Sequence, residues 1–296
     1  MYSLYICDML NLGLIGDIKL LEPFTHKAQE HPEVHVTGKS SVGIQPKPGS
    51  FKLQAPEFNR IELIERSDAL FINRFSLLPF SLLCDMVKKS KHIFAVEYPE
   101  LKPSEFIQLA KLAHEAKTVI QVKNSFYYLP AAQWMARNIK KPAFVEVTYF
   151  SQAAPDKNLV LQLILMLKDI TGTLPKRTGA ISFRSSPVDS SFFNVQLDYG
   201  DGSVVNLNFG KTDKTSRFEI RLFMTDRFVT LDLINDTYTD NDLPVNLDDP
   251  ELADETESFI NAILQKGKVA TSMETFSTAL TTMAMIQEKL NRYTTI

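Results

Sequence analysis

The chain has 296 residues, of which 44% are hydrophobic and 23% charged, and its formal net charge is −3. This length is enough for two domains with full hydrophobic cores. A slightly acidic chain offers no basic field that would attract nucleic acid, so we expect no nucleic-acid partner. The two cysteines, Cys7 and Cys84, have no metal-ligand spacing, and the five histidines form no ligand pair on one helix face. We therefore expect no disulfide framework and no metal site.

No run of 18 or more apolar residues is present, since the longest candidate, residues 159–167, is far too short to span a bilayer. The first residues are apolar but carry Asp8 and lack a basic beginning, which argues against a signal peptide. We expect no membrane association and a cytoplasmic location.

Apolar runs alternate with helical patterns through the first part of the chain, which predicts βαβ units and a parallel sheet. A Pro/Gly/Ser-rich stretch at residues 40–50 predicts a loop. The predicted strands are residues 10–15, 34–37, 69–73, 93–96 and 119–122, and the predicted helices are residues 18–29, 58–66, 79–89 and a helix that starts at Pro103.

After Asn124 the pattern changes to period-two strands, with hairpin turns at Asp201-Gly202 and Asp226-Arg227. The predicted strands are residues 144–150, 180–184, 192–199, 204–209, 218–225 and 228–233, and the helices are residues 129–139, 159–167, 251–265 and 275–291. We predict an α/β protein with an N-terminal Rossmann-like parallel-sheet domain, residues 1–123. A C-terminal α+β domain with a large, mostly antiparallel sheet follows at residues 124–296, with the last helix packing back on the first domain.

Residues 92–99 read His-Ile-Phe-Ala-Val-Glu-Tyr-Pro. The apolar run would bring Glu97, Tyr98 and Pro99 to the carboxyl edge of a parallel sheet, where ligands bind in open α/β folds. This stretch resembles the Glu-Lys-Pro signature of the glucose–fructose oxidoreductase/inositol dehydrogenase/MocA-like family of NAD(P)-dependent oxidoreductases. The Glu-Tyr-Pro form is similar to the biliverdin reductase branch, and the order and spacing of weaker motifs extend the resemblance over nearly the whole chain.

The resemblance implies a catalytic Lys where this chain has Tyr98. A tyrosine phenol is neutral near pH 7, so it could donate a hydrogen bond or protonate an anion, whereas Glu97 could anchor a ribose or act as acid/base. In the family, a helix of the second domain carries a catalytic His and Asp; Gln162 falls near the His position and cannot shuttle protons. The alternative is that Tyr98 fills space between domains and Glu97 is a paired or helix-capping carboxylate.

The Gly-rich phosphate turn is degenerate. When the pattern G-x-G-x-x-G is placed on Gly16, Ile18 and Leu21 replace the second and third glycines, and Asp17 adds a negative charge beside the expected phosphate. An ordinary turn without a ligand remains an alternative here.

Four further residues are candidate cofactor contacts. Lys39 and Ser40 follow the second strand, where a basic residue suits a 2′-phosphate, so they favour NADP if any dinucleotide binds. Asn73 and Arg74 follow the third strand, and Arg74 could hold a carboxylate or phosphate with paired hydrogen bonds. The alternatives are a solvated loop around Lys39 and a surface ion pair for Arg74.

Two functions remain open from the sequence. The first is an NADP-dependent reductase that transfers hydride to a small or conjugated acceptor. The second is a non-catalytic descendant that acts as a binding or assembly protein, which would explain the joint loss of the glycines, the Lys, the His and the Asp. In both cases we expect a homodimer formed through an open sheet face bearing Phe183, Phe193, Val195, Leu197 and Phe209.

Overall fold

The computed structural model describes residues 9–42, 55–155, 157–184, 191–214, 216–247 and 252–292. The chain divides into two compact units. Unit 1 consists of Met1–Lys123 and Ala253–Ser277, and unit 2 of Asn124–Leu252 and Thr278–Ile296. The chain thus returns to unit 1 after it has built the sheet of unit 2, and the long helix α8 (Met273–Asn291) has residues in both units.

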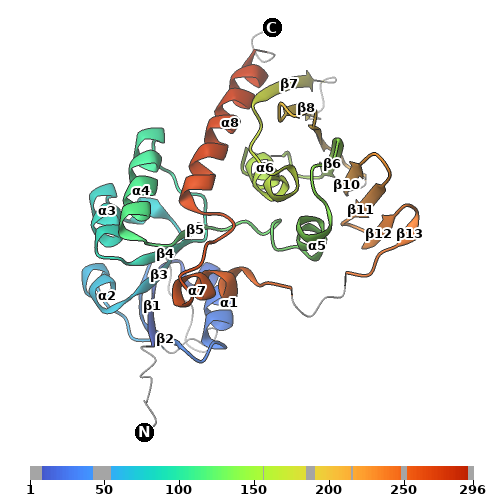
Figure 1. The fold of residues 1–296 in the computed structure, drawn as a ribbon. Coiled ribbons are helices and arrows are strands. Elements are labelled where there is room, and N and C mark those ends of the chain that lie inside the picture. Colours follow the sequence, from blue (N-terminus) through green and yellow to red (C-terminus); the bar gives the residue numbers. More distant parts are fainter. Residues whose placement is uncertain are drawn as a thin grey trace. The chain divides into compact units, whose positions relative to one another are not determined.

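Unit 1 is a five-stranded parallel sheet with helices on both faces (Figure 1). The strand order is β2 (Val34–Ser41), β1 (Leu10–Gly16), β3 (Ala69–Ile72), β4 (His92–Ala95) and β5 (Ile120–Val122). Helices α1 (Ile18–Gln29) and α7 (Glu255–Leu264) lie on one face, and α2 (Arg60–Arg66), α3 (Phe80–Lys88) and α4 (Pro103–Ala116) lie on the other (Figure 1). This confirms the Rossmann-like parallel sheet predicted from the sequence.

Because helices cover both faces of this sheet, its central strands are continuous apolar runs and not alternating ones. All of β3 is buried, and Phe71 of β3 and Phe94 of β4 point toward α1 and α7. Phe259 of α7 completes this aromatic core, with its ring centroid 5.9 Å from that of Phe71 and 5.6 Å from that of Phe94. A helix near the end of the chain therefore covers a face of the first sheet, which local sequence patterns do not reveal.

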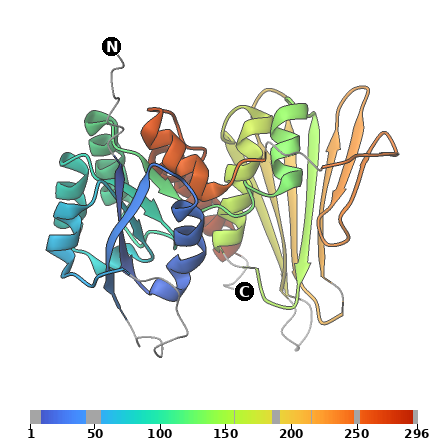
Figure 2. The same cartoon turned by 90° about the horizontal axis from the view of Figure 1, so that it is seen from below.

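Unit 2 is an eight-stranded, mostly antiparallel sheet, as predicted. Figures 1 and 2 show α5 (Pro130–Asn138) and α6 (Lys157–Thr171) on one face of it. The strand order is β13 (Leu243–Pro244), β12 (Thr237–Asp240), β11 (Phe228–Asp232), β10 (Arg217–Phe223), β6 (Phe144–Ser151), β9 (Val204–Lys211), β8 (Ser191–Asp198) and β7 (Arg177–Arg184). The β6–β9 pair is parallel, and the short strands β12 and β13 were not predicted.

The prediction that Phe193, Val195, Leu197 and Phe209 lie on an open face of this sheet is wrong. Val195, Leu197 and Phe209 are almost fully buried, and Phe193 stacks on Phe209 with a centroid distance of 4.7 Å, so these side chains belong to the core of the unit. The side chain of Phe183 lies outside the described residues. Because side chains alternate along a strand, these apolar residues go to the helix-covered face. The opposite face is polar in its middle, with the aromatic pairs Phe150–Phe192 and Phe144–Phe223 on either side.

The open face carries a polar ladder that crosses four adjacent strands. Asn194 donates to Asn208 at 2.8 Å, and Asn208 donates to Glu146 at 3.2 Å. Arg221 lies 3.7 Å from Glu146 and also pairs with Glu219, which accepts a hydrogen bond from Arg217 at 2.8 Å. We call these six residues the polar ladder: Asn194, Asn208, Glu146, Arg221, Glu219 and Arg217.

The stability of unit 1 should depend on the protonation of His92. Its Nδ1 accepts the backbone N–H of Val119 at 3.0 Å, and burial lowers the pKa of His92 below its usual 6.5, although Asp68 opposes this shift. The unfolded chain therefore binds a proton first, and the free energy of unfolding should fall as the pH drops through 6.5. Urea unfolding between about pH 8 and about pH 5 measures this loss.

The variant His92→Gln should flatten that pH profile, whereas His114→Gln, at an exposed position of α4, should leave it as in the wild type. Equal profiles for His92→Gln and the wild type would contradict the role assigned to His92.

Candidate ligand site at the carboxyl edge of the parallel sheet

The carboxyl ends of β1, β3 and β4 meet at one edge of unit 1, next to the point where the strand order changes direction. Backbone hydrogen bonds extend the sheet there by one residue beyond the strands: Asn73 N–H donates to Ile15 O at 3.2 Å, and Glu97 N–H donates to Asn73 O at 3.0 Å. Ligands of open parallel sheets bind at such a switch point. The fold thus brings together four of the residues predicted to form a site, Gly16, Asp17, Asn73 and Glu97, with Arg74 beside them.

The turn from β1 into α1 is filled by a side chain of the protein itself. Gly16 has a φ of +125°, which favours glycine, and a Cβ built there would lie 1.6 Å from Oδ1 of Asn73. That oxygen accepts the backbone N–H of Asp17 at 3.1 Å, and Asn73 is only 4% exposed. The space that glycine leaves open for a phosphate in a dinucleotide fingerprint is therefore taken by the Asn73 amide.

The start of α1 is also capped by its own carboxylate. Asp17 is the N-cap residue, and its Oδ1 accepts the backbone N–H of Lys19 at 3.0 Å. A carboxylate at this position is stabilised by the helix dipole and repels a second anion. Ile18 and Leu21, which replace two glycines of the fingerprint, are 5% and 0% exposed and pack in the core.

Glu97 connects this turn to Arg74. One carboxylate oxygen accepts Nδ2 of Asn73 at 3.2 Å, and the other accepts Nε of Arg74 at 2.8 Å. The Arg74 side chain is 61% exposed, so this ion pair contributes at most about 1 kcal/mol to stability. The main effect of the pair is to orient the Arg74 guanidinium, because Glu97 holds its Nε. The terminal guanidinium nitrogens of Arg74 make no hydrogen bond within the described part of the chain.

Tyr98 and Pro99 follow Glu97 but turn into the packing of unit 1. The ring of Tyr98 lies 5.1 Å from the ring of Phe276, which is fully buried and also contacts Phe106 of α4 at 5.5 Å. Pro99 is buried. Tyr98 is half-buried, so its position combines packing against Phe276 with partial access from the sheet edge.

The end of β2 differs from the sequence prediction. Ser40 was expected in a loop, but β2 continues through Ser41, and Ser40 is 7% exposed. The strand continues because its pairing with β1 extends to Gly16 opposite Ser41. On its other edge the carboxylate of Glu57 accepts the backbone N–H of Ser41 at 2.5 Å and its hydroxyl at 2.8 Å. Lys39 is half-buried in the same strand. The rest of the predicted loop, residues 43–50, lies outside the described residues.

Sequence reasoning missed Glu57, because it reaches the end of β2 from a segment 16 residues further along the chain, with no spacing motif. A carboxylate at the end of β2 is where NAD-binding folds recognise ribose hydroxyls. Here the Glu57 carboxylate already accepts two hydrogen bonds from Ser41.

Gln162 lies on α6 in unit 2. Most of α6 is buried, whereas Gln162 is half-exposed, and its backbone carbonyl accepts Nδ2 of Asn124 at 3.2 Å. Its side-chain amide makes no hydrogen bond within the described residues. Further along α6, Asp169 accepts the hydroxyl of Tyr127 at 2.5 Å, and burial together with this carboxylate raises the pKa of Tyr127 far above its usual value.

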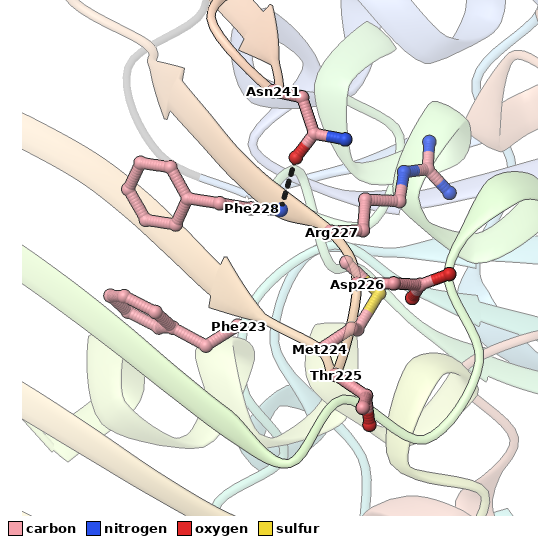
Figure 3. Close-up of a pocket in the computed structure, with 7 residues that line it drawn as sticks. All are labelled: Phe223, Met224, Thr225, Asp226, Arg227, Phe228 and Asn241. Atoms are coloured by element: carbon pink, nitrogen blue, oxygen red, sulfur yellow. Dashed lines mark hydrogen bonds between the residues drawn. The ribbon is translucent and has the colours of Figure 1, made fainter.

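A shallow hollow occurs in unit 2 at the β10–β11 turn (Figure 3). The rings of Phe223 and Phe228 point to one side of the hairpin, and Asp226 and Arg227 to the other (Figure 3). Arg227 is held by Asp240 at 2.9 Å and donates to the backbone carbonyl of Asn138, at the end of α5, at 3.0 Å. These contacts anchor the hairpin, and no polar groups converge in the hollow.

Other kinds of site are missing from the described residues. They hold no cluster of three or more His, Cys, Asp or Glu side chains that could bind a metal ion. Among the same residues, no helix is long and apolar enough to cross a bilayer.

Solved structures with the same fold are dehydrogenases and reductases. UDP-N-acetylglucosamine 3-dehydrogenase from Acidithiobacillus ferrooxidans is 18% identical with a TM-score of 0.78, and the match covers 96% of this chain and 99% of that one. A dehydrogenase from Chromobacterium violaceum is 13% identical with a TM-score of 0.72, covering 97% of each chain. Biliverdin reductase from Synechocystis sp. PCC 6803, solved with biliverdin and NADP+, is 12% identical with a TM-score of 0.71, covering 95% and 99%.

These likenesses show that the chain has the fold of the glucose–fructose oxidoreductase/inositol dehydrogenase/MocA-like dehydrogenases, as the sequence resemblance implied. No protein-family model matches the sequence. No curated protein matches it either.

The residues at the sheet edge do not fit a dinucleotide bound in the manner of this fold. A pyrophosphate would need the N–H groups at the start of α1, but Asn73 takes the N–H of Asp17 and the Asp17 carboxylate takes that of Lys19. At the other end of such a ligand, Glu57 takes the donors of Ser41. The Asp17 carboxylate would face the phosphates, and the Glu57 carboxylate, which stands where a ribose would be recognised, is already bonded to Ser41.

The variant Asn73→Ala should lower the free energy of unfolding by about 1–3 kcal/mol, because it leaves the N–H of Asp17 without an acceptor and Glu97 without one of its two donors. Urea unfolding measures the change. Asn138→Ala, which removes an exposed amide bonded only to its own helix, should cost much less. Equal losses in the two variants would show that the amide of Asn73 does not hold the turn.

Proposed function

We propose that this protein is a non-catalytic relative of the dehydrogenases whose fold it has, and that it binds an anionic small molecule at the carboxyl edge of the parallel sheet. The observation that carries this proposal is the hydrogen-bonded turn in which Asn73 and the Asp17 carboxylate occupy the phosphate position. The joint loss of residues that the resemblance implies also supports it, since Ile18 and Leu21 replace glycines, Tyr98 replaces the Lys and Gln162 replaces the His.

The class of ligand follows from the charges that remain at this edge. The Asp17 and Glu97 carboxylates are used in hydrogen bonds within the protein, whereas Arg74 keeps its terminal nitrogens available. A guanidinium oriented through Nε presents the other nitrogens to a carboxylate or phosphate in paired geometry. Arg74 is therefore the residue proposed to recognise the ligand, with Glu97 as its positioning residue.

A second candidate function is an NADP-dependent reductase of divergent type, with an unknown small or conjugated acceptor. The likeness to a biliverdin reductase solved with NADP+ favours it, as does Lys39 in β2 beside the expected 2′-phosphate position. In this case Glu97 and Tyr98 would contact the acceptor, and the Asn73 amide would have to leave the turn before the pyrophosphate could bind.

Titration calorimetry with NADPH and NADH distinguishes the two functions. We expect no heat of binding with either dinucleotide up to millimolar concentration, because the N–H groups of Asp17 and Lys19 at the start of α1 are already bonded. Micromolar NADPH binding that is weakened in Lys39→Met would contradict the non-catalytic proposal and support the reductase. The variant Asn73→Gly, which removes the amide from the turn, tests whether this side chain alone prevents binding.

A thermal-shift measurement with citrate and inorganic phosphate tests the anion site. The wild type should be stabilised by at least one of these probes, and Arg74→Met should lose that stabilisation. Arg66→Met is a matched control, because Arg66 is similarly exposed at 54% and pairs with Glu62 on α2. The same response in both variants would show that Arg74 does not hold the anion.

We further propose a homodimer formed through the open face of the unit 2 sheet. The polar ladder alternates Arg and Glu side chains, so a two-fold axis could place Arg221 of one copy opposite Glu219 or Glu146 of the other.

Light scattering should give twice the 33.5 kDa of one chain. Thr148→Arg, in the middle of this face, should give a monomer, and Gln152→Arg, at an exposed site outside the strands, should not. A wild type that scatters as a single chain would rule out a stable dimer.

A further inference from the structure

Lys123 stands one residue beyond β5 and extends the sheet toward its carboxyl edge. Its backbone N–H donates to Ala95 O at 2.9 Å, which continues the register in which Gln121 pairs with Phe94 and Val122 with Ala95. Side chains alternate along a strand, so Lys123 points to the same face as Gln121. The Gln121 amide donates to the carbonyl of Glu255 at the start of α7, which identifies that face as the one covered by α1 and α7.

The Lys123 ammonium lies against an aromatic ring. Its Nζ lies 5.2 Å from the centroid of the Phe24 ring on α1, and Phe24 in turn packs edge-on against Phe94 at 5.3 Å. Lys123 is half-buried. In the described residues, no carboxylate pairs with this ammonium and no oxygen accepts from it.

An ammonium has three N–H donors and a full charge, and an aromatic face satisfies it only in part. Lys123 therefore stands at the proposed ligand-binding edge. It is half-buried, and its N–H donors have no acceptor within the described residues. The side chains of Asn73 and Glu97, at the same edge, already have hydrogen-bond partners within the chain. A ligand group that accepts hydrogen bonds from this ammonium and balances its charge is an anion.

We propose that Lys123 binds a carboxylate or phosphate group of the ligand, with the Phe24 ring beneath the ammonium. This inference rests on the proposed anionic ligand and adds a second cation to Arg74. The two residues follow β3 and β5, which lie on either side of β4, so their strands are about 9–10 Å apart.

Titration calorimetry of the full chain with citrate and with inorganic phosphate tests this site in Lys123→Met and Arg74→Met. Methionine keeps most of the apolar stem and removes the charge. The matched control is Lys111→Met, because Lys111 is 77% exposed on α4 and lies 3.9 Å from Glu115. We expect Lys123→Met to weaken binding of the better probe by about 10- to 100-fold and Lys111→Met to leave it unchanged.

A second readout follows the ammonium itself. Lysines labelled by reductive ¹³C-methylation give separate NMR signals, and the signal missing in Lys123→Met identifies that residue. It should move on addition of the probe while the Lys111 signal stays in place. This readout does not depend on a change of affinity, and the circular dichroism melting curve of Lys123→Met verifies that the variant is folded.

The outcomes separate the two proposals. Binding that is lost in Arg74→Met, but is unchanged in Lys123→Met with an unmoved Lys123 signal, overturns the assignment of Lys123 and leaves the anion site intact. If the wild type binds neither probe at millimolar concentration, the anion site and the role of Lys123 are both overturned. A response to citrate alone assigns the ligand group as a carboxylate, and a response to phosphate alone assigns it as a phosphate.

Discussion

The edge of unit 1 depends on one buried amide. Asn73 lies at the end of β3 and bonds to the turn after β1 through its oxygen and to the carboxylate after β4 through its nitrogen. Three strand ends are thus held in register by a neutral side chain that is 4% exposed. Leaving a buried donor or acceptor unsatisfied costs more than a typical hydrogen bond contributes, so the amide is strongly retained in this position. The turn cannot both keep it and hold a phosphate.

This arrangement separates fold from activity. The chain has the fold of dehydrogenases over 96% of its length, yet the N–H groups of Asp17 and Lys19, at the turn where that fold holds a pyrophosphate, are bonded within the protein. Such a separation is expected, because the packing of a fold and the chemistry of a site on it are specified by different residues. Ile18 and Leu21 illustrate the point: their side chains add to the core of unit 1, and glycines at these positions would not.

Much of the fold could be predicted from local patterns. The buried run at β4 and the alternation in β6 and β9 each fixed the element type and its approximate bounds. Local patterns could not predict which face of the second sheet is open. An alternating strand has two faces, and the sequence does not say which one the helices cover. Val195 and Phe209 were assigned to the wrong face for this reason, and the polar ladder that occupies the open face consists of residues that no local motif connects.

At the site, the sequence by itself determined that Ile18 and Leu21 stand where a dinucleotide fingerprint has glycines, and that Asn73, Arg74 and Glu97 follow buried strands. The Lys expected at Tyr98 was an implication of the resemblance. Only the tertiary structure decided what took the place of the phosphate. The Asn73 amide acts across 56 residues and the Glu57 carboxylate across 16, and Lys123 meets Phe24 from the far end of the same sheet. Such contacts depend on strand order and register, which are properties of the assembled sheet and not of any one segment.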